Sequence, residues 1–259
     1  MKVVILAGGY GTRIRDVSND IPKPMIPIGN YPILWHIMKH FAHFSFKDFI
    51  LCLGYKNEVI KDYFLNYQKR QNDFTLDLKT QNIEDHTNRI IDDWKVTFVE
   101  TGLNSFTGAR IFRVKQYLEK DDYFMLTYGD GVSDIDVDKL FYFHKSHGKL
   151  MTVTGGHPPG RFGELELEDN LVVGFNEKPQ VTEGWISAGF FVCSRSVLDY
   201  LTPNEDLIFE KEPINNIVKD GQLMVYKHEG FWHPMDTSRD YQLLNQLWGQ
   251  NKAPWRTWE

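Results

Sequence analysis

Near its start the chain reads Val3-Val4-Ile5-Leu6-Ala7-Gly8-Gly9-Tyr10-Gly11-Thr12-Arg13. A short, continuous apolar run that ends in glycines predicts a buried strand of a parallel sheet, followed by a loop. Glycines in such a loop allow backbone N–H groups to approach phosphate oxygens, because no Cβ holds the phosphate away. The stretch therefore predicts an α/β protein with a phosphate-binding loop after its first strand. For two adjacent glycines alone, a surface turn is an equal alternative.

Strand and helix patterns alternate after this loop, as βαβ units require. Apolar residues recur every three or four positions after Pro32, which predicts a helix that is followed by a strand over 48–53. Residues 69–94 are polar and lack helical periodicity, so we expect an insertion, in the form of a hairpin. Short strands in the second half favour a mixed sheet. Further strands are predicted over 96–99, 123–128, 151–154, 165–168, 171–175 and 185–193, and further helices near 59–67, 108–118 and 138–147 and after Asp236-Thr237.

The composition excludes several classes of protein. The sequence has 259 residues, 42% of them apolar, and a net charge of -6 without a basic stripe, so nucleic acid is not an expected partner. The opening apolar run is too short for a signal peptide or a membrane span. Cys52 and Cys193 lie in apolar runs, which favours buried thiols in a reducing compartment. We expect a single domain over 1–259, in the cytoplasm and without a membrane partner.

Two cations stand close to the glycine loop in sequence. Arg13 ends the loop, and Lys23 follows between Pro22 and Pro24, whose rigid rings fix the local backbone. A guanidinium can bind a pyrophosphate with two hydrogen bonds, whereas an ammonium acts as a point charge on one phosphoryl group. The pattern is neither G-x-G-x-x-G before an apolar helix nor G-x-x-x-x-G-K-[ST], which disfavours a dinucleotide oxidoreductase and a P-loop protein.

The run Leu6-Ala7-Gly8-Gly9-x-Gly11-Thr12-Arg13 followed by Pro22-Lys23-Pro24 resembles the signature of nucleotidyltransferases that make sugar nucleotides. Other segments resemble the glucose-1-phosphate cytidylyltransferase branch of that family, and together they extend over nearly the whole chain. They are Ile33-Leu34-Trp35-His36-Ile37-Met38, Tyr128-Gly129-Asp130-Gly131, Pro159-Gly160-Arg161-Phe162-Gly163, Glu177-Lys178-Pro179, Pro234-Met235-Asp236-Thr237 and Ala253-Pro254-Trp255-Arg256-Thr257-Trp258-Glu259.

The resemblance implies a Rossmann-like nucleotidyltransferase fold, with a mixed central sheet flanked by helices. It implies a nucleotide-binding part over about 1–130 and a sugar-binding part over about 131–259. The implied reaction transfers a cytidylyl group from CTP to α-D-glucose 1-phosphate and gives CDP-glucose, a precursor for deoxysugars and O-antigen polysaccharide, and pyrophosphate. Mg²⁺ is the implied cofactor, and a homo-oligomer is the implied assembly.

By the same resemblance Lys23, Arg13, Asp130 and Asp236 are the catalytic residues, and the two aspartates share one Mg²⁺. A hard cation that keeps several waters needs only one or two protein carboxylates besides substrate phosphates, which agrees with this pair. For either aspartate alone, a turn residue or a helix cap is the alternative.

The resemblance also assigns residues to the two substrates. Ser105 to Arg110 opens a predicted helix, and an ordinary Ser/Thr cap with a solvated arginine is the alternative for this segment. The nucleotide would contact Leu6, Ala7, Gly8, Gly9, Tyr10, Gly11, Thr12, Arg13, Lys23, Ser105, Thr107, Gly108, Arg110 and Gly129. The sugar phosphate would contact Gly163, Glu177, Lys178 and Gly189.

Two positions depart from the pattern of the resembled branch. Ser187-Ala188-Gly189 stands where Asn-Gly-Gly is expected, and Glu100 stands where Asp is expected. Both lie near the expected ligands, so another sugar 1-phosphate stays open as substrate. Thymidylyl or uridylyl transfer stays open as well, because the sequence does not show which groups meet the base. A binding homologue without turnover is the alternative outside the enzymes, and the intact glycine loop, Lys23 and both aspartates argue against it.

Overall fold

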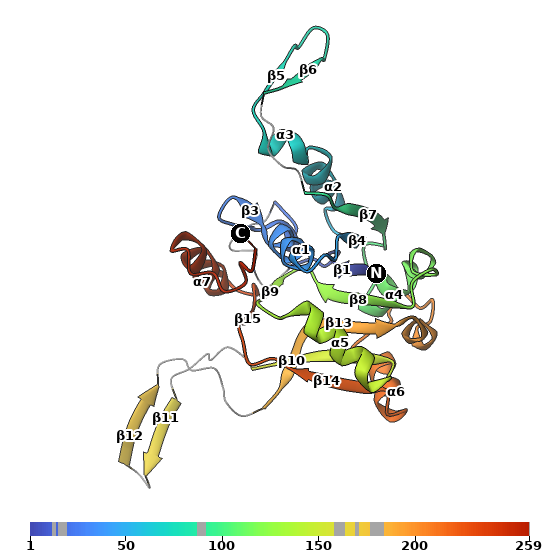
Figure 1. The fold of residues 1–259 in the computed structure, drawn as a ribbon, viewed down its shortest axis with the longest axis vertical. Helices are drawn as coiled ribbons and strands as arrows, with labels where there is room; N and C mark the ends of the chain where they lie inside the picture. Colours follow the sequence, from blue (N-terminus) through green and yellow to red (C-terminus); the bar gives the residue numbers. More distant parts are fainter. Residues whose placement is uncertain are drawn as a thin grey trace.

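The computed structural model describes residues 1–11, 14, 20–86, 92–157, 164–168, 171–176 and 184–258, with the backbone alone for 164–168 and 171–176. A seven-stranded central sheet forms the middle of the molecule, with helices on both of its faces (Figure 1). The predicted mixed central sheet flanked by helices is confirmed. Its strands, in order across the sheet, are β14 (Leu223–Lys227), β10 (Met151–Gly156), β13 (Ile186–Ser194), β8 (Tyr123–Tyr128), β1 (Lys2–Leu6), β4 (Asp48–Leu53) and β7 (Lys95–Glu100).

Strand direction decides which residues meet at one edge of this sheet. β8, β1, β4 and β7 run parallel, and β13 runs antiparallel to both β8 and β10. The carboxyl ends of β1 and β8 therefore meet the amino-terminal part of β13, where Phe190 pairs with Thr127. Ligands of open α/β sheets bind outside the carboxyl ends of the strands, so this edge is the expected place for a site.

The two faces of the sheet bury different side chains, because successive side chains of a strand point to opposite faces. In β1, Val3 and Ile5 belong to one core cluster, which contains Phe41 of α1, and Val4 belongs to the other, with Ile111 of α4. The helices are α1 (Ile33–His43), α2 (Asn57–Leu65), α3 (Tyr67–Gln71), α4 (Thr107–Arg113), α5 (Val137–His147), α6 (Glu212–Lys219) and α7 (Ser238–Gly249), with 3-10 helices η2 (Lys23–Met25), η3 (Lys115–Tyr117) and η4 (Arg195–Tyr200).

Two hairpins extend away from the body (Figure 1). The predicted hairpin in the polar insertion is formed by β5 (Phe74–Leu76) and β6 (Ile83–Asp85). We expected the strands over 165–168 and 171–175 to belong to the mixed sheet, and this was wrong. β11 (Glu164–Glu168) and β12 (Leu171–Asn176) pair with each other in a separate two-stranded sheet. Only two residues separate them in sequence, which favours local pairing over a place in a distant sheet.

Two short pairs of strands complete the fold. β2 (Pro27–Ile28) pairs with β3 (Tyr31–Pro32), just before α1. β9 (Gly131–Ser133) pairs antiparallel with β15 (Trp232–Pro234), and this ladder joins segments that lie about a hundred residues apart. Strands of three residues are too short for a periodic pattern, so the sequence did not predict them.

The cysteines and three helix histidines are core residues. Cys52 and Cys193 are fully buried, as predicted, and burial raises the pKa of Cys52 to about 12. His36, His40 and His144 are buried as well, and burial lowers the pKa of each to about 4, so they are neutral at pH 7. None of the helices in the described ranges is long and apolar enough to cross a membrane.

Candidate active site

A cavity of about 660 Å³ opens at the carboxyl ends of β1 and β8. We call it the larger cavity. Its lining comes from the glycine loop after β1, from η2, from the segment that opens α4, and from the ends of β8 and β15. The lining residues are Leu6, Ala7, Gly8, Gly9, Tyr10, Gly11, Lys23, Pro24, Leu103, Asn104, Ser105, Phe106, Thr107, Arg110, Tyr128, Gly129, Asp130, Asp206 and Asp236.

Lys23 lies between the two aspartates that the sequence singled out. Its Nζ donates to Asp130 Oδ2 at 2.5 Å and to Asp236 Oδ1 at 2.6 Å. Burial alone would lower the pKa of Lys23, but the charges and hydrogen bonds of Asp130 and Asp236 outweigh it and raise the pKa above 10.5. The ammonium is therefore fully charged at neutral pH.

The β9–β15 ladder brings the two aspartates together. Gly131 pairs with Pro234, and the ladder continues with Met235 N donating to the carbonyl of Asp130 at 2.8 Å. Asp130 precedes β9 and Asp236 follows β15 by two residues, so both carboxylates emerge at the same end of the ladder. The short antiparallel pair thus brings together two side chains that are far apart in sequence.

A capping box fixes the backbone beside Asp236. The side chain of Thr237 accepts from Asp240 N, and Asp240 Oδ2 in turn accepts from the N–H groups of Thr237 and Asp236. Burial would raise the pKa of Asp240, but its bonds with His233 and Thr237 lower the pKa to about 2. The N-cap of α7 is Thr237, so the structure excludes the alternative that Asp236 is a helix cap.

These carboxylates fit a divalent ion. Two oxygens that converge on one ammonium converge equally on one metal cation, and Mg²⁺ prefers hard oxygen donors. No group of three or more His, Cys, Asp or Glu side chains within the described part of the chain could hold a metal ion. A pair of protein carboxylates is the set expected for a Mg²⁺ that keeps waters and binds substrate phosphates.

The glycine loop packs directly against η2. Gly11 has φ of +60°, and a Cβ there would come within 2.9 Å of the Cβ of Lys23. Both the left-handed backbone and this close contact exclude larger residues. The loop and the lysine are thereby held at contact distance, so backbone N–H groups of the loop and the ammonium can act on one anion.

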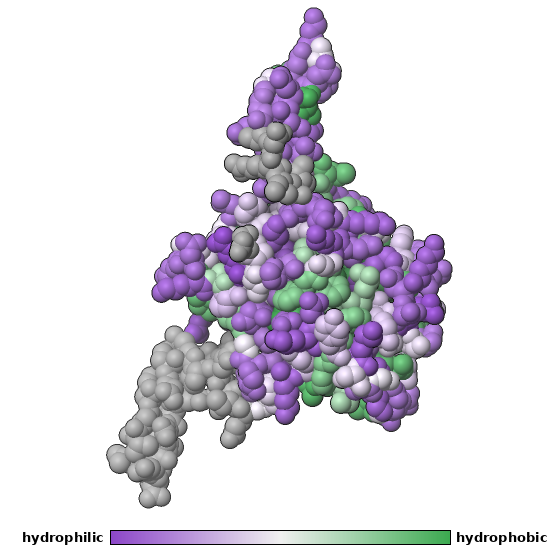
Figure 2. Space-filling view, in the orientation of Figure 1, coloured by the Kyte–Doolittle hydropathy of each residue, from purple (hydrophilic) through white to green (hydrophobic). Residues whose placement is uncertain are grey.

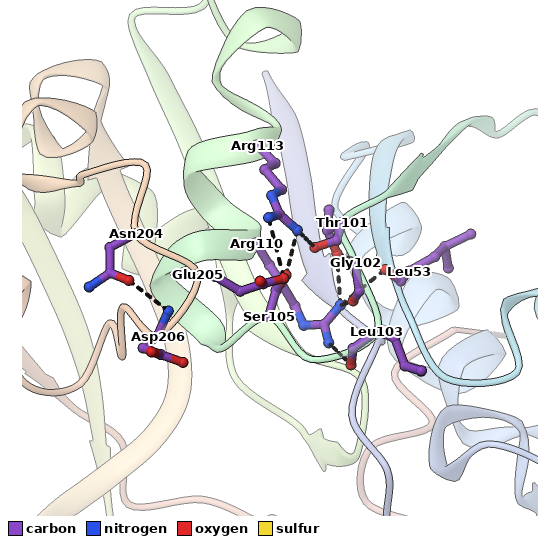
Figure 3. A network of polar contacts seen from close by, with 10 residues as sticks. All are labelled: Leu53, Thr101, Gly102, Leu103, Ser105, Arg110, Arg113, Asn204, Glu205 and Asp206. Carbon is purple, nitrogen blue, oxygen red and sulfur yellow. Dashed lines mark hydrogen bonds and ion pairs between the residues drawn. The ribbon is translucent and has the colours of Figure 1, made fainter.

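Arg110 forms hydrogen bonds to three loops around the larger cavity. Figure 3 draws its bonds to Leu53 and to residues 101–103. Its guanidinium is buried and donates to five protein acceptors. A Cβ on Gly8 would come within 2.2 Å of Arg110 Nη1, so the glycine is needed for this approach. Burial lowers the pKa of Arg110, yet a guanidinium stays charged in proteins. The acceptors are the carbonyls of Gly8, Leu53, Gly102 and Leu103 and the hydroxyl of Thr101.

A distant segment, 204–210, docks on the amino-terminal turn of α4. Phe106 N donates to the carbonyl of Glu205, and the N–H groups of Gly108 and Ala109 donate to that of Leu207. The Glu205 carboxylate accepts from Ser105 Oγ at 3.1 Å and forms an ion pair with Arg113 (Figure 3). These contacts satisfy donors at the start of α4 and fix one wall of the larger cavity.

A smaller cavity of about 80 Å³ lies on the other side of Asp130. It shares Tyr128 and Asp130 with the larger cavity and is otherwise lined by residues of β8, β9, β13 and β15. Trp232 Nε1, on this lining, is buried and has no hydrogen-bond partner among the residues that the structure describes. The lining residues are Thr127, Tyr128, Asp130, Gly131, Ser187, Ala188, Gly189, Phe190, Trp232 and Pro234.

The Nucleotidyl transferase family model matches residues 2–247. The chain is 48% identical, over 259 residues and the full length of both proteins, to the glucose-1-phosphate cytidylyltransferase of Salmonella typhi. The chain belongs to the nucleotidyl transferase family. This confirms the resemblance that the sequence motifs indicated.

Solved structures agree on the fold of this nucleotidyl transferase. HddC from Yersinia pseudotuberculosis superposes with a TM-score of 0.69 at 24% identity, covering 95% of this chain and 99% of that one. The UTP-bound UGPase from Acinetobacter baumannii superposes with a TM-score of 0.68 at 18% identity, covering 96% and 93%. The family generally uses a divalent metal ion, which is consistent with the paired carboxylates.

Most residues assigned to the nucleotide from the sequence line the larger cavity, and Gly189 lines the smaller one. Gly108 lies outside both linings and packs against Leu207 instead. Thr12, Arg13, Gly163, Glu177 and Lys178 lie outside the described residues.

The sequence did not single out six residues that line the larger cavity. Pro24 and Tyr128 belong to quoted motifs and Phe106 to the segment Ser105 to Arg110, but the sequence analysis assigned none of them a role. Asp206 reaches the cavity only because segment 204–210 docks on α4, and no local pattern marks such a contact. The six are Pro24, Leu103, Asn104, Phe106, Tyr128 and Asp206.

Proposed function

We propose that this chain is a glucose-1-phosphate cytidylyltransferase, which joins CTP to α-D-glucose 1-phosphate and releases pyrophosphate. The observation that carries the proposal is the convergence of Lys23, Asp130 and Asp236 in the larger cavity, where Asp130 also lines the smaller one. The 48% identity to the enzyme of Salmonella typhi, over the full length of both chains, supports the choice of substrates.

In this proposal the larger cavity binds CTP and the smaller cavity binds the glucosyl group. The glycine loop would meet the triphosphate, and the segment that opens α4 would meet the cytidine. The phosphate of the sugar would then lie beside Asp130, which lines both cavities. In this proposal the nucleotide part lies mainly within about 1–130 and the sugar part mainly within about 131–259, although Asp206 and Asp236 line the larger cavity and Thr127 and Tyr128 line the smaller one.

The reaction would be a direct in-line attack by a sugar phosphate oxygen on the α-phosphorus of CTP. A phosphate monoester is already ionised near pH 7, so the attack needs no general base. Lys23 would donate to the α-phosphate and offset the charge that develops there, and Arg13 would bind the departing pyrophosphate. Asp130 and Asp236 would hold a Mg²⁺ ion, which would supply further positive charge to the phosphates. Positioning and charge neutralisation would account for the rate.

The smaller cavity offers one donor for sugar recognition. The indole N–H of Trp232 is buried and has no partner within the described part of the chain, and an unsatisfied buried donor costs about 1–3 kcal/mol. A Cβ placed on Gly131 would lie 3.6 Å from this nitrogen, so the N–H sits beside the residue that follows Asp130. We infer that it donates to a hydroxyl of the sugar. A sugar without that hydroxyl would leave the donor unsatisfied and bind more weakly.

Choice of cytosine requires an acceptor for its 4-amino group, because uracil and thymine present a carbonyl at that position. Segment 103–107 and the Asp206 carboxylate line the cavity where the base would lie. We expected Arg110 to contact the nucleotide. Because its guanidinium already serves five protein acceptors, we propose that it acts chiefly by holding the three loops in place.

The implied homo-oligomer stays a prediction. The β5–β6 arm carries the exposed apolar side chains Phe74, Leu76, Leu78 and Ile83, of which Leu78 is 78% exposed. On the face drawn in Figure 2 the arm is otherwise mostly hydrophilic. Apolar side chains on a projecting hairpin favour burial against another surface. Light scattering on a size-exclusion column would measure the number of chains per particle, and a single chain would contradict the prediction.

One screen tests the proposed reaction. Pyrophosphate release is measured for CTP, UTP and dTTP against a panel of hexose 1-phosphates, with Mg²⁺ present. We expect the highest kcat/KM for CTP with α-D-glucose 1-phosphate. A preference for UTP or dTTP would overturn the cytidylyl assignment, and a preference for another sugar phosphate would overturn the glucosyl assignment.

A further inference from the structure

The Lys23 ammonium lies at the point where the carboxylates of Asp130 and Asp236 converge. Its Nζ lies 2.5 Å and 2.6 Å from one oxygen of each. Its side chain is only 12% exposed, so protein surrounds most of this contact. The same two oxygens are the ones that a shared divalent ion would use.

The ammonium and the ion cannot both stay at this point. Mg²⁺ binds oxygen at about 2.0–2.1 Å, so an ion that used the same two oxygens would lie close to the nitrogen. Two cations at such a distance repel strongly, and the repulsion is larger at a partly buried place than in water. One must leave before the other binds.

We propose that Lys23, in addition to its contact with the α-phosphate, keeps the metal site closed until a nucleotide binds. This rests on the proposed function, in which the nucleotide phosphates enter beside the glycine loop. The incoming phosphates draw the ammonium away from the carboxylates, and the exchange leaves both oxygens to the ion. The chain therefore binds the ion weakly without nucleotide and tightly with it.

The local structure lets the side chain move while its backbone stays in place. Pro22 and Pro24 flank Lys23, and Pro24 and Met25 are buried, so η2 is anchored. The four-carbon stem carries the ammonium on rotatable bonds. Lys23 lines the larger cavity together with Gly9 and Gly11, so the space it would move into is the space of the phosphates.

Binding of Mn²⁺ to the full chain, followed by electron paramagnetic resonance without nucleotide or sugar phosphate, tests this exchange. Lys23→Met keeps the length of the side chain and removes its charge. Lys39→Met removes one charge from a different ion pair, with Asp92, and is the matched control. We expect Lys23→Met to bind Mn²⁺ at least about tenfold more tightly than the wild type, and Lys39→Met to bind like the wild type.

Equal Mn²⁺ affinity in the wild type and Lys23→Met would overturn the proposal. A thermal melt gives a second readout, since Mn²⁺ alone should raise the Tm of Lys23→Met and leave that of the wild type nearly unchanged. If Lys23→Met does not fold, wild-type protein decides: CTP should increase the Mn²⁺ bound beyond the sum of the separate protein and CTP samples. No increase would overturn the exchange. Tight binding by wild-type protein alone would overturn the exchange and leave the cytidylyl reaction intact.

Discussion

The two cavities on either side of Asp130 are built in different ways. Loops at the carboxyl ends of parallel strands form the larger cavity, and a buried guanidinium, Arg110, bonds these loops to one another. Side chains at the start of the antiparallel strand β13 and on β15 line the smaller cavity. A backbone that the buried Arg110 holds in place suits recognition of the triphosphate, which all the nucleotide substrates share. Side chains suit the choice among sugars, because one substitution can change them without moving a strand.

The two aspartates that bind Lys23 should have the largest effect. Asp130→Asn and Asp236→Asn each remove an anionic ligand and preserve the shape of the side chain. We expect turnover to fall by roughly 10²- to 10³-fold or more in each variant. Steady-state kinetics at saturating Mg²⁺ measure this loss, with circular dichroism to confirm the fold. Asp93→Asn, at an exposed carboxylate, is the control. Near-normal turnover in either site variant would contradict the shared-metal assignment.

Lys23→Ala should have the next largest effect, and it tests whether the larger cavity contributes to the chemical step. An ammonium that offsets charge in the transition state contributes more to kcat than to nucleotide affinity. We expect kcat to fall by about 10²-fold, with a smaller change in the dissociation constant of CTP. Calorimetry with CTP separates the two quantities. If the variant lost only affinity for CTP, Lys23 would contribute to nucleotide binding and not to the chemical step.

The same contrast explains what the sequence could predict. Strand β1 and the glycine loop are contiguous, and Lys23 follows them closely in sequence. Their local patterns predicted a buried strand that ends in a loop. Asp130 and Asp236 were paired only through a resemblance, because the three-residue strands β9 and β15 that join them have no periodic signal. Asp206 was missed for the same physical reason, since its place depends on the docking of segment 204–210 on α4. Contacts between distant segments have no local signature.

Arg110→Ala tests the hydrogen bonds that hold the loops of the larger cavity in place. Removing a buried guanidinium leaves several carbonyls without their donor, so we expect the free energy of unfolding to fall by about 2–4 kcal/mol. Because the loops loosen together, CTP and UTP should lose affinity alike, roughly ten- to a hundredfold, without a change in preference. Denaturant melts and kcat/KM for both nucleotides measure these effects, with Arg195→Ala as an exposed control. A changed base preference would show that Arg110 itself contacts the base.

Trp232→Phe tests the smaller cavity, and its effect should be the smallest in size and the most selective. The substitution removes the buried indole N–H and keeps an aromatic ring. The wild type should lose about tenfold in kcat/KM with the deoxy sugar 1-phosphate that lacks the bonded hydroxyl, since one unsatisfied buried donor costs about 1–3 kcal/mol. A panel of 2-, 3-, 4- and 6-deoxyglucose 1-phosphates identifies that hydroxyl. In Trp232→Phe the same deoxy sugar should be used nearly as well as glucose 1-phosphate, while KM for CTP stays unchanged. Trp185→Phe, outside the lining of this cavity, should keep the wild-type discrimination. If Trp232→Phe discriminates like the wild type against all four deoxy sugars, the indole does not select the sugar. A rise in KM for CTP would show that the two cavities are not independent and would contradict their separate roles in nucleotide and sugar binding.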